Sequence, residues 1–383
     1  MSAVRAIAFT VLLSSATVTV AQSPDAPTPT VPVREYPETS ISSLPRWTVA
    51  GPSLSIGQVL GEPHYEFNRA AWPWRLSDGR IVVANDGVEL RIYSGSGTFL
   101  ETVGRRGQGP GEYRELAWVW RGAGDTLRVV DCTSRRVDVR APDGKVARVI
   151  RMVGCHEPHW LPDGSALVAV PKRPDPDRPG LQKGSLELRH MRSDGTLDAP
   201  VAVQSGGWTS VSGRDSWRDV RLSGWYRLAS GARGAVYIDD DYLTLHWFDV
   251  VGRPNAISRV VSPRIRATDG DIRAYERFLL QLRARNPQVR AEGAQPPPIY
   301  AEYVPQVSRL RVDREGNAWV QRWARWGTAM AEWIVFAPFG GPIAAVNLPA
   351  GFNPYDIGSD YVLGIATDND GVQFVQQFQL RRR

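Results

Sequence analysis

Hydrophobic and polar positions alternate along most of the chain, in short apolar runs separated by polar turns. Many of these turns contain a glycine, often in an Asp-Gly pair such as Asp78-Gly79 or Asp163-Gly164. Alternation with a period of two on both sides of an Asp-Gly pair is typical of a β-hairpin. From about residue 46 onward the pattern therefore predicts β-strands.

The runs recur in a fixed order: two strands joined by a tight turn, a polar break, and two further strands joined by a second tight turn. One copy extends from Trp74 to Val103 and another from His159 to Val203. The last copy, Tyr355–Leu380, has only three strands, and Ser53–Gln58 supplies the fourth. Repeated four-stranded units are typical of a β-propeller. We predict an all-β fold: a six-bladed β-propeller of four-stranded blades, closed by an N-terminal strand. A pair of β-sandwiches explains neither the repeated turn order nor the missing strand.

One insertion, at about residues 264–300, interrupts the repeats. Thr268–Asp271 is similar to a capping box, and apolar residues then recur at helical spacing until Asn286-Pro287. The insertion is therefore expected to contain a helix. The helix is either a lid packed on the rim of the propeller or a surface that binds a partner.

The start of the chain has the composition of a targeting signal. Residues 1–21 combine a basic residue, an apolar run and small residues before Gln22, as in a cleavable signal peptide. The alternative is a membrane anchor, for which the apolar run is short. Residues 22–45 are rich in Pro and read as a flexible linker, which leaves 46–383 as the propeller. We expect a periplasmic or secreted protein with no stable membrane span.

The predicted loops are unequal on the two faces of the ring. All turns inside the hairpins are short, whereas every long segment falls in the breaks and in the crossings between blades. Binding residues commonly lie on long loops held by a rigid scaffold, so we expect a ligand on this long-loop face. The long segments are Gly104–Tyr113, Val153–Pro158, Pro171–Gly184, Gln204–Val220 and Ser262–Pro305.

The segment Gly104–Tyr113 reads Gly-Arg-Arg-Gly-Gln-Gly-Pro-Gly-Glu-Tyr. It resembles the Gly-Pro-Gly-Glu-aromatic motif of the secreted bacterial six-bladed β-propeller family, which is related to NHL-repeat propellers. Leu310–Val320 and the ending from Asp360 to Leu380 also fit that family. The resemblance covers about residues 46–383. It implies a fold and export, because the family has no common established activity.

The net charge of the chain indicates little about its function. Lys and Arg number 46 against 40 Asp and Glu, for a net charge of +6. The basic residues are dispersed, whereas nucleic-acid binding needs a focused basic patch, so no nucleic-acid partner is expected.

The two cysteines, Cys132 and Cys155, fall on the long-loop face and are either bridged in an oxidising compartment or buried as thiols.

The residues that could carry chemistry form no strong motif. The run Cys155–His159 could suggest a metal site, but Pro158 excludes the helix of a zinc protease. The Gly-rich run after Gly104 does not open a helix, so a phosphate loop is poorly supported. The five His assemble no specific Ser-His-Asp set. Acidic residues that end the second strands could instead bind calcium, as in lactonase propellers, or hold loop N–H groups. They are Asn85-Asp86, Asp131 and Asp239–Asp241.

Two functions remain open at this point. The first is an exported propeller, monomeric and without a cofactor, that binds a small molecule or a protein without catalysis. The second is a metal-dependent hydrolase or lyase of the lactonase-like type. No catalytic residue is identified, and the tryptophans near the innermost strands either line the channel or pack between blades. The candidate ligand-binding residues are Trp72, Trp74, Arg105, Arg106, Glu112, Tyr113, His156, His159, Arg214 and Asp215.

Overall fold

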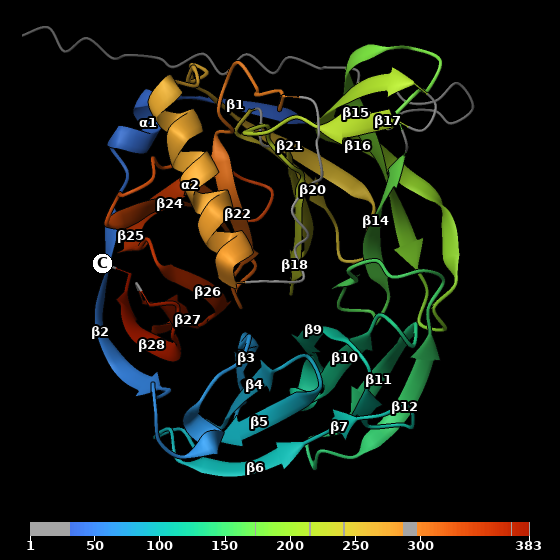
Figure 1. Ribbon diagram of the computed structural model, residues 1–383, viewed down its shortest axis with the longest axis vertical. Coiled ribbons are helices and arrows are strands. Elements are labelled where there is room, and N and C mark those ends of the chain that lie inside the picture. The colour runs from blue at the N-terminus through green and yellow to red at the C-terminus, as the bar shows by residue number, and fades with distance from the viewer. Residues whose placement is uncertain are drawn as a thin grey trace, which may run out of the picture.

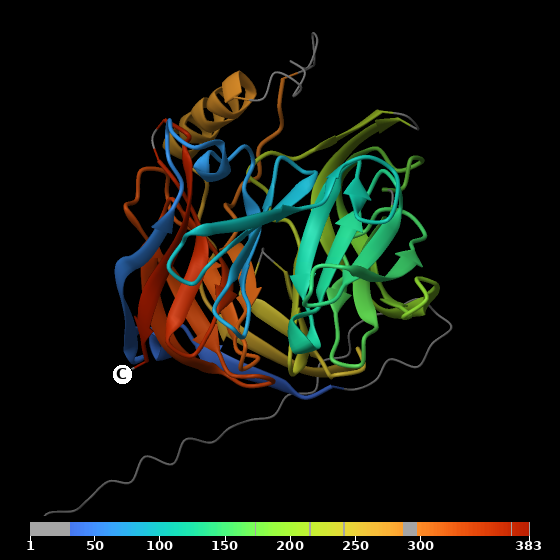
Figure 2. The same cartoon turned by 90° about the horizontal axis from the view of Figure 1, so that it is seen from below.

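The computed structural model describes residues 31–172, 174–213, 216–239, 242–285, 297–368 and 370–382. In these ranges strands dominate, and the helical elements are α1, α2 and the short 3-10 turns η1 (Pro63–Tyr65) and η2 (Ala123–Asp125). Figure 1 shows the strands as twisted sheets around a central axis, and Figure 2 shows the ring edge-on. The fold is all-β and of the propeller type, as predicted. The predicted signal peptide, residues 1–21, and linker residues 22–30 lie outside the described residues.

Consecutive strands pair antiparallel in groups of four, and the first strand of each group is the innermost. The first group is β3 (Ala71–Arg75), β4 (Ile81–Asn85), β5 (Glu89–Tyr93) and β6 (Phe99–Val103). The second group is β9 (Leu116–Arg121), β10 (Leu127–Asp131), β11 (Arg136–Arg140) and β12 (Val146–Arg151). A parallel pair of two-residue strands, β7 (Arg105–Arg106) and β8 (Glu112–Tyr113), lies at the crossing between these groups.

The remaining groups follow the same order around the ring. The third is β13 (His159–Trp160), β14 (Ala166–Lys172), β15 (Gly180–Met191) and β16 (Leu197–Gly213). The fourth is β18 (Arg227–Gly231), β19 (Gly234–Asp239), β20 (Thr244–Phe248) and β21 (Pro254–Val261). The fifth is β22 (Val307–Val312), β23 (Ala318–Arg322), β24 (Met330–Phe336) and β25 (Pro342–Pro349). The sixth is β26 (Phe352–Ile357), β27 (Tyr361–Thr367) and β28 (Gln373–Arg381), completed by β2 (Arg46–Ile56).

The closing strand is longer than the predicted Ser53–Gln58. β2 pairs antiparallel with β28, from Thr48 opposite Arg381 to Ile56 opposite Val375. Its first residues also pair parallel with β25, which joins the fifth and sixth groups into one eight-stranded sheet. The early part was missed because the ladder changes register between Ala50 and Leu54, which breaks the alternation of side chains.

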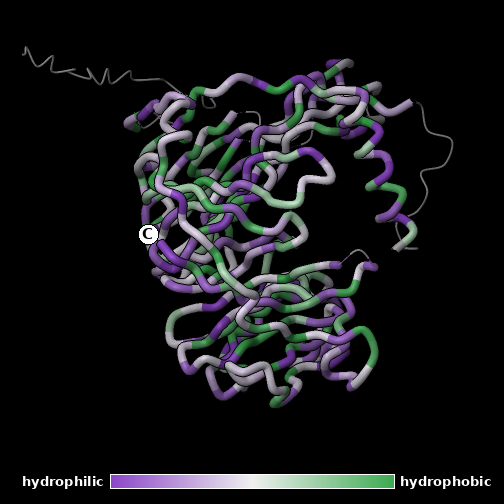
Figure 3. The backbone as a smooth tube through the Cα atoms, turned by 90° about the vertical axis from the view of Figure 1, so that its left-hand side faces the viewer, coloured by the Kyte–Doolittle hydropathy of each residue, from purple (hydrophilic) through white to green (hydrophobic). Residues whose placement is uncertain are grey.

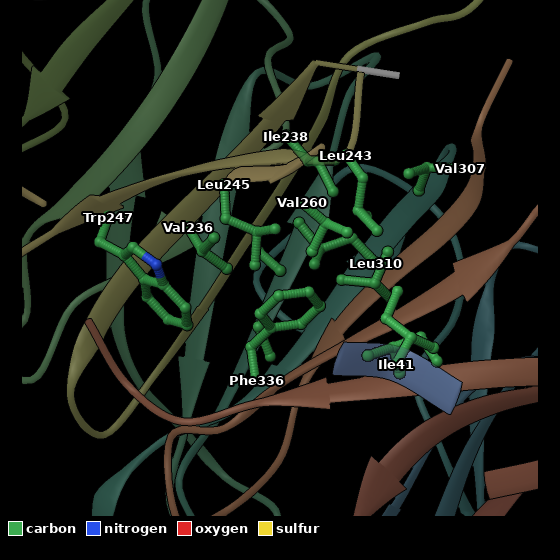
Figure 4. Close-up of a cluster of buried hydrophobic side chains, with 14 of the residues drawn as sticks. Ile41, Val236, Ile238, Leu243, Leu245, Trp247, Val260, Val307, Leu310 and Phe336 are labelled. Atoms are coloured by element: carbon green, nitrogen blue, oxygen red, sulfur yellow. The ribbon is translucent and has the colours of Figure 1, made fainter. Parts of the chain in front are cut away.

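Residues 31–45 depart from the predicted flexible linker. β1 (Val33–Pro37) pairs parallel with the outer edge of β21, and α1 (Thr39–Ser42) follows. Ile41 of α1 is 3% exposed and packs against the fourth and fifth groups (Figure 4). The high proline content of residues 22–45 hid these two apolar anchors, Val33 and Ile41. An unpaired edge of a sheet is a ready template for such a strand.

Two of the predicted long loops are also ordered as strands. β15 and β16 continue through parts of Pro171–Gly184 and Gln204–Val220, and β17 (Ser216–Asp219) adds to the edge of β16. The third sheet therefore projects beyond its neighbours on the long-loop side. Polar and small residues in these stretches suggested loops, but a strand exposed on both faces needs no apolar alternation.

The predicted helix is present as α2 (Asp269–Arg285). Its start is a capping box with an aspartate: the backbone N–H of Thr268 donates to Asp271 (3.0 Å), and that of Asp271 donates to the Thr268 hydroxyl (3.2 Å). The helix packs on the rim through an Asp271–Arg325 ion pair and a Tyr275–Trp326 ring contact. Figure 3 shows α2 standing at one side of the ring. No helix of the described residues is both long and apolar enough to cross a membrane.

The core lies between neighbouring sheets. Apolar side chains from the facing surfaces of the fourth and fifth groups, including Val236, Leu245, Leu310 and Phe336, form one continuous cluster (Figure 4). Other clusters of this kind join the remaining neighbours around the ring. Since apolar burial supplies most of the stability of a fold, the sheets hold one another in place and fix the inner strands.

Candidate functional site

A central cavity of about 340 Å³ lies where the innermost strands converge. Every group of strands contributes to its wall, through β3, β9, β13 and the residues before it, β18, β22 and β26. Trp72 and Trp74 of β3 both reach the cavity, although the pairing of β3 with β4 shifts register between Ala71 and Trp74. The lining residues are Trp72, Trp74, Trp120, Glu157, His159, Trp225, Tyr226, Arg227, Leu228, Ala229, Ser230, Leu310, Arg311, Val312 and Tyr355.

Aromatic rings form one wall of the central cavity. The ring of Trp120 lies 6.3 Å from that of Trp72 and 6.1 Å from that of Trp74, centre to centre. Tyr355 meets Trp72 edge to face at 5.2 Å. Trp72 has a φ of 53°, in the left-handed region that bulky residues rarely adopt. Strained backbone of this kind persists where the surroundings hold it, often at ligand sites.

Two arginines of β22 supply positive charge beside the Tyr355 end of the aromatic wall. Arg311 donates to the Pro354 carbonyl (2.6 Å), the Leu310 carbonyl (2.9 Å) and the Asn353 side chain (3.1 Å). Arg309 donates to Gln321 (3.0 Å). In the described part of the chain, no carboxylate lies within 4.0 Å of either guanidinium. Burial lowers the pKa of both arginines, because the charged form loses hydration.

Glu157 is the carboxylate of the central cavity. Its side chain keeps 35% of its surface exposed, but it lies deep in the ring, and burial raises its pKa to about 7 against the opposing effect of Arg311. His159, two positions further along, is 5% exposed, and burial lowers its pKa to about 3. The imidazole is therefore neutral at physiological pH, whereas Glu157 is balanced between its two forms.

Replacing Glu157 with Gln should stabilise the protein at high pH. The folded pKa of about 7 exceeds the ordinary value of 4.5, so stability falls as pH rises from about 4.5 to about 7 and stays reduced above that range. We expect equal melting temperatures for wild type and Glu157→Gln at pH 4. At pH 8 the variant should melt about 2 °C higher, for about 1 kcal/mol, a value discounted for residual solvent. Calorimetric melting tests this, with exposed Glu101→Gln as the control. Equal melting at pH 8 would contradict it.

A disulfide holds the segment that leads to Glu157. Cys132, just after β10, is bridged to Cys155, with their Cα atoms 5.2 Å apart. This joins the end of the second group to the crossing before β13. His156, between the bridge and Glu157, is half-buried outside the cavity lining, and burial lowers its pKa.

The candidates from the Gly-Pro-Gly-Glu segment do not line the central cavity, and their role in ligand binding stays a prediction from the sequence. Arg105 and Glu112 form an ion pair (2.7 Å) at a separate outer hollow, and Arg106 is exposed beside them. Tyr113 is fully buried, and its hydroxyl accepts from Arg140 (2.8 Å). The motif shapes the crossing, since Arg136 donates to three of its carbonyls. The other two candidates, Arg214 and Asp215, lie outside the described residues.

Three of the side chains proposed to bind calcium already have partners within the chain. Asn85 accepts the backbone N–H of Asn68 (2.9 Å), and Asp131 accepts those of Arg114 and Ser134 (both 2.9 Å). Asp239 pairs with Lys183 at 3.2 Å and lines a different hollow, of about 870 Å³. Among the described residues, no three His, Cys, Asp or Glu gather closely enough to hold a metal ion. Asp240 and Asp241 lie outside these residues, and calcium binding stays a prediction from the sequence.

The structure does assemble one serine, histidine and aspartate that the sequence did not reveal. In the third group, the Ser165 hydroxyl lies 2.7 Å from Nε2 of His190, whose Nδ1 lies 3.4 Å from Asp198. The hydroxyl also donates to Asp163 (2.5 Å), and Ser165 is 6% exposed. A nucleophile must give its proton to the histidine and reach a substrate. The Ser165 hydroxyl is buried and donates its proton to Asp163. We therefore assign a structural role to these hydrogen bonds, which join the two hairpins of the third sheet.

No family model matches this chain, and no curated protein matches it. Among solved structures, a candidate exported protein of Bacteroides fragilis NCTC 9343 is 12% identical, with a TM-score of 0.49 over 92% of this chain and 99% of that one. Regucalcin of Agrobacterium tumefaciens C58, a calcium-binding protein, is 11% identical, with a TM-score of 0.43 over 88% and 97%. A gluconolactonase of Xanthomonas campestris is 13% identical, with a TM-score of 0.40 over 82% and 87%. At this similarity the likenesses assign neither ligand nor reaction.

Proposed function

We propose that this protein is an exported six-bladed β-propeller, each four-stranded group being one blade, that binds a small ligand in its central cavity without catalysing a reaction. The observation that carries the proposal is the convergence of all the inner strands on one cavity lined by aromatic rings, a carboxylate and arginines. Ligand sites are concave, mostly apolar, and carry a few placed polar groups.

The position of the cavity supports access from the long-loop face. Trp72, Glu157 and Trp225 lie at or just before the starts of inner strands, where the crossings between blades enter. Trp225 is 48% exposed and so marks an opening to solvent. Export is supported by the signal-like composition of residues 1–21 and by the disulfide, since disulfides persist in oxidising compartments.

A Trp72→Ala variant tests the binding function. The Trp72 indole makes no hydrogen bond to any described residue, so the change removes wall surface and little else. Compounds from a library of sugars, sugar acids, aromatic acids, amines and peptides are first scored by the rise in melting temperature. We expect hits whose affinity, by calorimetry, falls about tenfold or more in Trp72→Ala.

The matched control is Trp326→Ala, which removes a 39% exposed tryptophan at the rim, in contact with Tyr275. Its affinity for each hit should equal that of wild type. The proposal is overturned if no compound binds, or if every hit binds Trp72→Ala as tightly as wild type.

A further inference from the structure

A second cavity, of about 390 Å³, lies at the opposite end of the ring from the opening of the central cavity. Its rim is formed by the turns between the first two strands of the second to fifth groups, at Ala123, Pro162, Ala232 and Arg314. Ala123, Pro162 and Ala232 are exposed, so this cavity is open to solvent. Because these hairpin turns lie on the face opposite the long loops, we call this space the turn-side cavity.

Arg128 of β10 forms part of the wall of the turn-side cavity. It stands opposite Trp120 in the pairing of β10 with β9. Its guanidinium lies over the ring of Trp160 in the next group, 4.5 Å from the ring centre. A cation over an aromatic ring is stabilised without a hydrogen-bond acceptor. The contact with Trp160 therefore leaves the N–H donors of the guanidinium available to a ligand.

Arg128 has no ionic partner in the described part of the chain. Its guanidinium makes no hydrogen bond there and has no carboxylate within 4.0 Å. Burial lowers the pKa of Arg128, and no charged group among the described residues counters this effect. The other charged side chains of the wall are paired within the chain: Arg121 with Asp125 (2.6 Å), Arg314 with Asp356 (2.7 Å) and Asp313 with Arg382 (3.2 Å).

Two indole N–H groups beside Arg128 also lack an acceptor among the described residues. They belong to Trp120 and Trp160, which both line the turn-side cavity, and Trp160 is 6% exposed. Buried donors in proteins are normally hydrogen-bonded. Water can serve an indole N–H, but it does not neutralise a partly buried positive charge. This wall therefore favours a ligand whose oxygens carry negative charge.

We propose that the turn-side cavity is a second ligand site, which takes a small organic carboxylate with its two oxygens on the guanidinium of Arg128. The flat fork of a guanidinium matches the two oxygens of a carboxylate, which makes this pairing stronger than one with a neutral acceptor. The rings of Trp120 and Trp160 supply apolar surface for the body of the ligand. This site lies outside the proposed function and does not rest on it.

Calorimetry on the full chain tests the inference with benzoate as the probe and benzamide, which is neutral and of the same shape, as the comparison. We expect benzoate to bind at least about tenfold more tightly than benzamide. Arg128→Met should weaken benzoate about tenfold or more, because the charged donors are lost. Arg128→Lys keeps the charge without the fork, so its affinity for benzoate should fall between those of Arg128→Met and wild type.

A variant at the rim keeps the test decisive if Arg128→Met fails to fold. Ala232 is an exposed turn residue of the cavity rim, so Ala232→Trp adds a ring at the mouth and should weaken benzoate about tenfold. Val251→Trp is the matched control, because Val251 is 40% exposed in the other hairpin turn of the same group and lies outside the cavity lining. It should bind benzoate as wild type does.

The inference is overturned if benzoate does not bind, if benzamide binds as tightly, or if folded Arg128→Met or Ala232→Trp binds benzoate normally. The two proposals fail independently. Compounds that depend on Trp72 should bind Arg128→Met as they bind wild type, because Arg128 does not line the central cavity. Loss of such compounds in Arg128→Met would show that the two cavities are not separate sites.

Discussion

A chain that begins at residue 59, and so lacks β1 and β2, is expected not to fold. β2 pairs with β28 from Thr48 to Ile56 and also meets β25, so its loss exposes the edges of two strands at once. It also removes Ile56, which is 2% exposed in the core between the sixth and first groups. Open edges of this kind favour aggregation.

A series of truncated chains, measured by circular dichroism and gel filtration, tests this expectation. A chain that begins at residue 31 keeps both strands and should fold. A chain that begins at residue 44 loses β1 and α1 but keeps β2, and should fold with a lower melting temperature, because Ile41 leaves its cluster. The chain from residue 59 should aggregate or lack a cooperative transition. A monomeric product with wild-type melting would show that the ring does not need β2.

Replacing Asp356 with Ala should lower the free energy of unfolding by about 3–5 kcal/mol. Asp356 is 1% exposed, and its carboxylate accepts from the backbone N–H of Arg75 (2.9 Å), the hydroxyl of Tyr361 (3.0 Å) and the guanidinium of Arg314 (2.7 and 2.9 Å). These donors come from the first, sixth and fifth groups. One carboxylate therefore ties three neighbouring groups of strands together, and its removal leaves buried donors without an acceptor.

Urea denaturation of three variants isolates this effect. Asp356→Asn keeps one acceptor oxygen and should lose less stability than Asp356→Ala. Asp143→Ala is the matched control, since Asp143 is an exposed turn residue, with 56% of its side chain accessible, that accepts from the backbone of Lys145. Its change should stay within about 0.5 kcal/mol. A loss below about 1 kcal/mol for Asp356→Ala would rule out the tie.

The regular part of the fold was readable from the sequence because turn chemistry is local. Asp-Gly pairs fix hairpins through φ values that glycine adopts freely, and Gly79 and Gly164 have φ of 89° and 86°. The closing strand could be predicted because the last repeat has only three strands and therefore lacks a fourth. The structure of residues 33–45 could not be predicted in this way. It depends on pairing with the edge of β21, which lies more than 200 positions away along the chain and leaves no local pattern in the sequence.

The candidate site was predicted in part, for a related reason. Trp74 and His159 stand in the cavity because each lies five positions before a turn glycine, on an innermost strand, whereas Trp72 reaches it next to a register shift of β3. Arg311 stands at the same distance before Gly316 as His159 before Gly164, so the same spacing could have found it. The described residues of Gly104–Tyr113 do not line the central cavity, and the path of this crossing depends on contacts such as those of Arg136, which its own sequence does not show.

The pairing of β2 with β28 also bears on how the molecule is made. Ser53 of β2 donates to Gln377 of β28, its partner 324 positions later in the chain. Synthesis proceeds from the N-terminus, so β2 emerges long before the strand it needs, and the earlier blades can assemble while the ring is still open. Contacts of such long separation form slowly. Closure is thus a late step, and the emerging chain exposes an incomplete sheet until β28 has been made.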